Sequence, residues 1–209
     1  IPGSKIKLLI NENADRISVL KSFRQWAKSE IDPGKTEFIF YFAGHGLATP
    51  DGKNLYLLNY DSDTDLLNES AFSISQLIKI LKELQPKHVT LILDTCYSRF
   101  GRADKLLVAD ARPAAFVVNE QTYPKNFTVL SAASNDEISS GLKETGHGLF
   151  SYHLMKGLEG GADKNNDKKI TLSELHAFTK SKVVKDAARM GRNQNPDLQG
   201  QGDKVVVQW

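Results

Sequence analysis

Two residues of this chain could form a catalytic pair. Cys96, the only cysteine, ends the apolar run HVTLILDTC, and His45 closes a second such run, EFIFYFAGHG. A thiol and an imidazole are enough for nucleophilic catalysis, because the sulfur can attack a carbonyl carbon while the ring handles the proton. The simpler alternatives are a small buried core residue for Cys96 and an ordinary loop residue for His45. A single cysteine cannot form an intrachain disulfide.

The elements around these residues predict where they lie. Strands alternate with helices, and the strands over residues 38–43 and 89–93 are apolar almost throughout, as in a parallel sheet buried on both faces. We therefore predict a three-layer α/β/α sandwich with a mostly parallel central sheet. Reactive groups gather at the carboxyl ends of such strands, so His45 and Cys96 should share one sheet edge. Strands are predicted over residues 5–10, 38–43, 54–58, 89–93, 127–133 and 204–208, and helices over about 14–29, 73–84, 149–158 and 172–189.

Composition bounds the class of protein. The 209 residues suit one domain, and 27 basic against 25 acidic residues do not indicate a nucleic-acid partner. No apolar stretch approaches the roughly 20 residues that cross a bilayer, so no membrane partner is expected. One cysteine fits a reducing compartment, and we expect a cytoplasmic protein. The chain opens at Ile1 without a signal-peptide pattern, so the natural N-terminus, with any targeting address, is expected upstream.

The motifs resemble a known family. YFAGHG followed by LILDTCYS is similar to the caspase–metacaspase group of cysteine peptidases, especially its metacaspase-like, bacterial-type members. The interval from His45 to Cys96 is 51 residues, against about 50 in caspases. SAASNDEISS (131–140) and GHGLFSYHLMKGLEGGAD (146–163) are similar to later segments of the family. The resemblance runs from about Lys5 and implies a caspase-like fold whose first strand and helix would precede Ile1.

The resemblance assigns roles at the pair. It implies that Cys96 is the nucleophile and His45 the base, and that proteins or peptides are the substrates, with no required cofactor. The backbone N–H groups of Gly46 and Cys96 could form the oxyanion hole, because Gly46 has no side chain to block approach. His147 is a rival base in a second GHG triplet, but it opens a helical pattern instead of ending a strand. The other histidines (His88, His153 and His176) are predicted to be surface or helix residues.

Asp94 is the predicted specificity residue. It lies two positions before Cys96, so both side chains share a face if the strand continues that far. The resemblance implies that Asp94 forms the acidic floor of the S1 pocket and selects Arg or Lys at P1. Alternatively, Asp94 caps the following helix or binds backbone amides. Ala43 stands where metacaspases often have serine. A second pocket acid would come from the segment before Ile1, and another is frequent where this chain has Gly141, a place that Asp136 or Glu137 could fill.

Two further segments suggest regulation. Oxygen ligands at EF-hand spacing occur at Asp163, Asn165, Asp167 and Glu174. Lys168 replaces the turn glycine, and Thr171 with Glu174 makes a capping box, which we favour over a calcium site. At the calcium site of metacaspases, Asp61 matches the first ligand, but Ser75 and Gln76 replace paired acids. Calcium dependence therefore stays open.

The segment after Cys96 is basic. Family members are often cut there during activation, and Arg102 and Lys105 are the best predicted self-cleavage sites; the alternative is a solvated loop. The prediction from the sequence is thus a monomeric, self-processing cysteine endopeptidase that cuts after Arg or Lys. The alternatives are a catalytically silent scaffold or sensor, and a protease dedicated to one partner protein. Residues 204–208 are a candidate edge strand for dimerisation.

Overall fold

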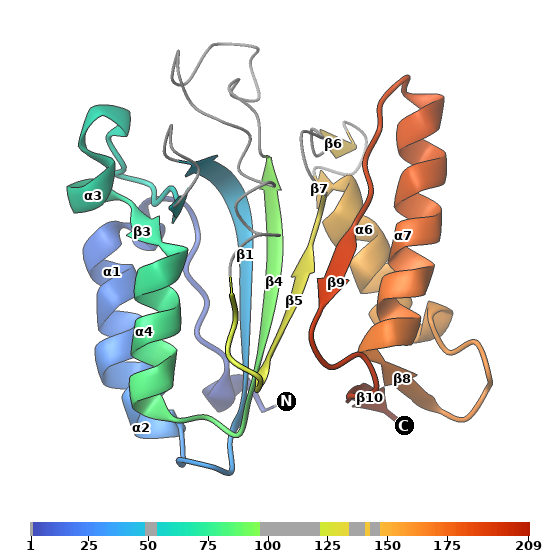
Figure 1. The fold of residues 1–209 in the computed structure, drawn as a ribbon, viewed down its shortest axis with the longest axis horizontal. Helices are drawn as coiled ribbons and strands as arrows, with labels where there is room; N and C mark the ends of the chain where they lie inside the picture. The colour runs from blue at the N-terminus through green and yellow to red at the C-terminus, as the bar shows by residue number, and fades with distance from the viewer. Residues whose placement is uncertain (1, 49–53, 97–121, 134–140, 143–146) are drawn as a thin grey trace.

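The computed structural model describes residues 2–48, 54–96, 122–133, 141–142 and 147–209 (Figure 1). A six-stranded sheet in the order β3-β2-β1-β4-β5-β9 lies between two helical layers. In Figure 1, α1, α2 and α4 cover one face and α6 and α7 the other. The sheet is parallel at its centre and antiparallel at both ends. The predicted α/β/α class is confirmed.

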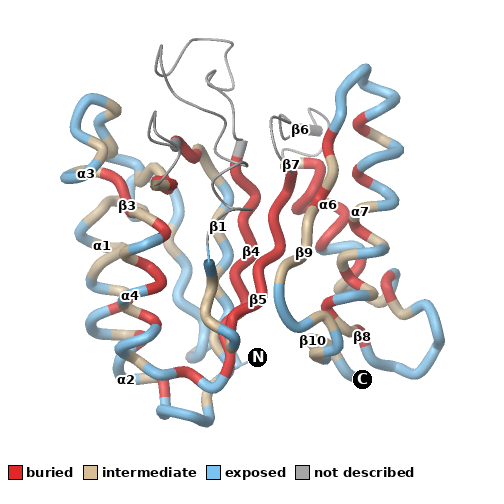
Figure 2. The backbone as a smooth tube through the Cα atoms, in the orientation of Figure 1, coloured by how far each residue is buried: buried red, intermediate tan, exposed pale blue. Residues whose placement is uncertain are grey.

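The parallel centre consists of β1 (Glu37–Ala48), β4 (His88–Cys96) and β5 (Phe127–Ser131). β4 and β5 are buried on both faces, as Figure 2 shows. The expectation that β1 is buried on both faces is wrong, because Ile39 and Tyr41 are 46% and 49% exposed. The helices on that side pack on β4 and β5 and leave this face of β1 open. Among the described residues, positions 37–45 of β1 pair only with β4.

Shorter strands complete the sheets. β2 (Leu55–Leu57), β3 (Phe72–Ser73) and β9 (Asp197–Gln199) extend the central sheet. β10 (Val205–Gln208) pairs instead with β8 (Lys169–Thr171), and β6 (Gly141–Leu142) pairs with β7 (His147–Gly148). The predicted C-terminal strand therefore exists, but it is not an edge of the central sheet. The edges of the described central sheet are β3 and β9, and the sequence predicted neither strand.

The first helical layer contains one long N-terminal helical segment and α4 (Ile74–Leu84). The segment runs through α1 (Arg16–Lys21), η3 (Ser22–Ala27) and α2 (Lys28–Glu30). Phe23 stacks on Phe72 at a centroid distance of 5.4 Å and anchors the segment in the core. The Ser73 hydroxyl accepts the N–H of Gln76, as the predicted N-cap requires. Short helical turns occur at η1 (Gly3–Lys5), η2 (Asn11–Ala14), η4 (Thr64–Leu66) and α3 (Leu67–Ser70).

The predicted strand over residues 5–10 is wrong. Residues 6–10 belong to no described helix or strand, and the side chains of Ile6, Leu8 and Ile10 are exposed. A strand forms only against a neighbour that pairs with its backbone, and no described strand pairs with this segment. An alternation of apolar residues is therefore insufficient here.

The second layer contains α6 (Leu149–Lys156), η5 (Gly157–Gly161) and α7 (Leu172–Arg189). α7 has the predicted bounds, and the Thr171–Glu174 capping box is present. These helices bury Leu149, Phe150 and Leu175 in a core shared with Ile92 and Leu130 of the sheet. Among the described helices, none is long and apolar enough to cross a bilayer.

Candidate active site

His45 and Cys96 lie opposite each other in the sheet. They are paired positions of the parallel strands β1 and β4, at the carboxyl end of the matched register that begins at Glu37 and His88. Neighbouring strands lie about 4.8 Å apart, and paired positions belong to the same face of the sheet. The backbone therefore brings the two predicted residues together, 51 positions apart in sequence.

The backbone around His45 is held from both sides. β4 pairs with it on one side, and on the other the N–H of Leu58 donates to the His45 carbonyl at 2.9 Å. Gly46 then pairs with Leu57 in the antiparallel β2. Gly46 is buried, and a Cβ there would lie 3.4 Å from Cβ of Thr95. The half-buried His45 is thus fixed in place where the strand leaves the parallel region.

Asp94 is buried and hydrogen-bonded. It is 6% exposed, and it is the only acidic residue among those buried in the described part of the chain. Its Oδ2 accepts the hydroxyl of Ser151 and, at 3.3 Å, the backbone N–H of the same residue. Ser151 is the third residue of α6, where backbone N–H groups have no partner within the helix. Asp94 therefore binds a backbone amide, as the alternative interpretation held, but in a helix 57 residues away.

Two neighbours of Asp94 were not predicted. The hydroxyl of Tyr41 lies 2.6 Å from Oγ of Ser151. Gly148 lies so close that a Cβ there would be 2.3 Å from Oδ2 of Asp94. Its φ of −62° and ψ of 145° suit any residue, so space and not backbone freedom requires glycine. The sequence signal for these neighbours is Gly148 itself, which directly precedes a helical pattern and is followed three positions later by Ser151.

The EF-hand-like segment is a capped turn. The carboxylate of Asp163 accepts the N–H groups of Asp167 and Lys168, and Asp167 accepts that of Lys169. Glu174 accepts the N–H and hydroxyl of Thr171. Lys168 takes the left-handed conformation (φ 64°) usual for the glycine it replaces.

The oxygens of this segment thus bind backbone groups of their own turn. Asp61, at the other acidic site considered, accepts the N–H of Arg16. A search of the described residues finds no group of three acidic, histidine or cysteine residues arranged for a metal.

The remaining candidates divide into two groups. Asp136, Glu137, Arg102 and Lys105 lie outside the described residues, as do the side chains of Cys96 and His147. His153 and His176 are helix residues, as predicted, and bond to Asp186 and the Pro196 carbonyl. The prediction for His88 is wrong, because it is 4% exposed at the start of β4.

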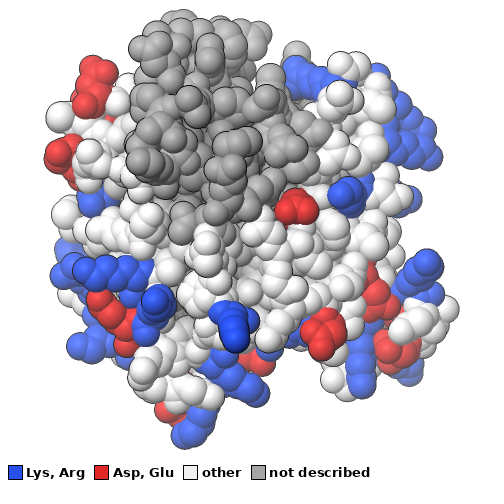
Figure 3. Space-filling view, in the orientation of Figure 1, with Lys and Arg blue, Asp and Glu red and all other residues white. Residues whose placement is uncertain are grey.

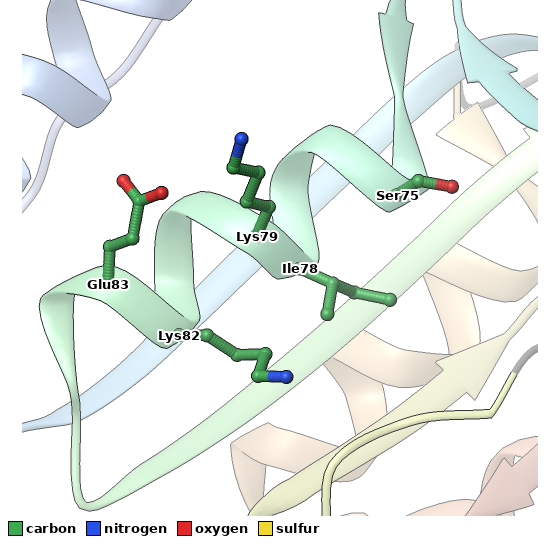
Figure 4. Close-up of a pocket in the computed structure, with 5 residues that line it drawn as sticks. All are labelled: Ser75, Ile78, Lys79, Lys82 and Glu83. Atoms are coloured by element: carbon green, nitrogen blue, oxygen red, sulfur yellow. The ribbon is translucent and has the colours of Figure 1, made fainter.

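One pocket of the described residues lies away from this site. A pocket of about 400 Å³ on α4 is lined by Ser75, Ile78, Lys79, Lys82 and Glu83 (Figure 4), none of them in the catalytic prediction. Figure 3 shows basic and acidic side chains interspersed over the visible described surface.

The comparison with protein families agrees with this geometry. The family model described as the caspase domain matches residues 5–205. The chain belongs to the caspase domain family. It is thus a cysteine peptidase-type domain, and His45, Cys96 and Asp94 all lie within the matched region. The predicted resemblance to caspases is confirmed, whereas the bacterial, metacaspase-like branch stays a prediction. A search of curated proteins found no match.

Proposed function

We propose that this caspase domain is a cysteine endopeptidase in which Cys96 and His45 form the catalytic dyad. The observation that carries the proposal is their pairing at the carboxyl ends of β1 and β4. A caspase domain with a cysteine and a histidine at paired positions has both groups that thiol proteolysis needs.

The mechanism requires one nucleophile and one proton carrier. The Cys96 thiolate attacks the carbonyl carbon of the scissile bond, and the N–H groups of Gly46 and Cys96 stabilise the oxyanion, each donor by about 3 kcal/mol. Protonated His45 then gives its proton to the leaving amine as the C–N bond breaks, which leaves a thioester. Neutral His45 next takes a proton from water, whose oxygen attacks the thioester. The C–S bond then breaks, the carboxylic acid leaves, and the starting pair of Cys96 thiolate and protonated His45 is restored.

We further propose that Asp94 selects Arg or Lys at P1. A buried carboxylate on the face of the dyad would attract a cation far more strongly than an exposed one, since water screens it less. Such specificity also supports self-cleavage after Arg102 or Lys105.

The test is hydrolysis of fluorogenic peptides with Arg, Lys or Asp at P1, with calcium and with chelator. We expect cleavage after Arg and Lys by the wild type, and none by Cys96→Ala or His45→Ala. Activity that survives Cys96→Ala would contradict the dyad. A folded wild type that cuts no peptide would contradict a general endopeptidase and leave the scaffold and the protease dedicated to one partner protein. Activity with calcium but not with chelator would show that calcium is required.

A further inference from the structure

Two hydroxyl groups connect β1 to the Asp94 carboxylate through α6. The Tyr41 hydroxyl lies 2.6 Å from Oγ of Ser151, and the Ser151 hydroxyl donates to Oδ2 of Asp94. The backbone N–H of Ser151 reaches the same oxygen at 3.3 Å. The three side chains come from three elements that are distant in sequence, so only the packed fold creates this connection.

Proton counting fixes the direction of the bonds. An ionised carboxylate only accepts, and a serine hydroxyl has a single proton. Since Ser151 gives that proton to Asp94, Tyr41 must donate to Ser151. Burial raises the pKa of the Tyr41 hydroxyl, and the charge of Asp94 adds to this, although the Ser151 bond opposes it. Tyr41 therefore remains a donor over the neutral pH range, and the order is Tyr41 to Ser151 to Asp94.

The bonds restrict how the carboxylate can turn. Rotation about the last torsion of an aspartate is broad and is not confined to staggered positions. The position paired with Asp94 on β1 is Ala43, whose side chain has no hydrogen-bond donor. One side-chain donor to Asp94 is Ser151 of α6, and the half-exposed Tyr41 polarises the Ser151 hydroxyl from β1.

Orientation matters more for one substrate cation than for the other. A guanidinium binds a carboxylate through two parallel N–H groups, which requires the two planes to align. An ammonium is a point charge with rotatable donors and tolerates a turned carboxylate. Because both hydroxyls are neutral, their removal takes no charged group from the site and removes hydrogen bonds that orient Asp94.

We infer that Ser151 and Tyr41 are positioning residues that orient Asp94 for bidentate contact with arginine and so set the preference for Arg over Lys at P1. This inference rests on the proposed function. The inference concerns two residues outside the dyad and the discrimination between Arg and Lys, which the charge of Asp94 alone does not provide.

The experiment compares kcat/KM for Arg-P1 and Lys-P1 peptides. In Ser151→Ala we expect the Arg-to-Lys ratio to fall about tenfold, the value of a hydrogen bond to a charged group. Tyr41→Phe should lower the same ratio by a smaller factor. Ser151→Thr keeps a hydroxyl and should have the Arg-to-Lys ratio of the wild type. Tyr60→Phe is the matched control, because Tyr60 is 67% exposed and outside the site. An unchanged ratio in Ser151→Ala or Tyr41→Phe with normal unfolding temperature overturns the inference.

Binding separates this inference from the proposed function. Agmatine carries a guanidinium at one end and an ammonium at the other, whereas cadaverine carries an ammonium at both ends. The difference in their affinities therefore reports the guanidinium, and it can be measured on Cys96→Ala by calorimetry without turnover. If the wild type cuts no peptide but agmatine binds more tightly than cadaverine only when Ser151 is intact, the enzyme proposal fails and the positioning role holds. If Ser151→Ala leaves this difference unchanged, or if neither amine binds, the positioning role is overturned.

Discussion

Gly148→Ala is a sharp perturbation of Asp94, because it changes no charge and the backbone angles of Gly148 suit alanine. The new Cβ would lie 2.3 Å from Oδ2, 3.1 Å from Cγ and 3.2 Å from Oδ1 of the carboxylate. Ordinary contact begins near 3.4 Å, so the carboxylate must retreat by about 1 Å. Overpacking of this kind destabilises by about 1–3 kcal/mol. A displacement of about 1 Å at a reactive site can lower activity about 100-fold.

The assays are urea unfolding and kcat/KM with an Arg-P1 peptide. We expect Gly148→Ala to lose about 2 kcal/mol of unfolding free energy and most of its activity on this peptide. Gly3→Ala is the matched control, because a Cβ there meets no atom within 4 Å. In an Asp94→Ala background the clash disappears, so Gly148→Ala should then have little effect on stability. An equal loss of stability in both backgrounds, or full Arg activity in Gly148→Ala, would refute the reasoning.

Three further predictions concern the rest of the molecule. Gly46→Ala should keep the unfolding temperature, because its Cβ would lie at an ordinary contact distance of 3.4 Å from Thr95. It should lower kcat, because the new methyl group crowds the oxyanion. An unchanged kcat would contradict the oxyanion role of Gly46. Burial lowers the pKa of His88, and the nearby Lys204 lowers it further, whereas Glu37 raises it. Near this pKa the folded state therefore binds fewer protons than the unfolded state. The unfolding free energy measured in urea should therefore decrease as the pH is lowered below about 6.5, by at most about 1.4 kcal/mol per pH unit. The decrease should be smaller in His88→Gln. Thr171→Ala should cost about 1 kcal/mol, equally with calcium or chelator; a calcium-dependent cost would indicate a metal site.

The sequence predicted what local patterns determine. The apolar runs before His45 and Cys96 located β1 and β4, and Thr171 with Glu174 marked the start of α7. It did not predict the bonds from Ser151 to Asp94, because they join residues 57 positions apart with no shared periodicity.

Burial was also harder to predict than secondary structure. Residues 38–43 have the same apolar composition whether or not a helix covers them, so the exposed Ile39 and Tyr41 could not be predicted. Residues 5–10 have the composition of a strand, but pairing depends on a neighbour that no local pattern reveals.

Alkylation of Cys96 by iodoacetamide is the most direct test of the dyad. Since the chain has one cysteine, every label reports this residue. A free thiol reacts slowly at pH 6, because its pKa is about 8.5, whereas a thiolate paired with an imidazolium is already present there. We expect the folded wild type to react at pH 6 at least about tenfold faster than His45→Ala, with the two rates converging towards pH 9. Identical rates at pH 6 would contradict a catalytic pair of His45 and Cys96.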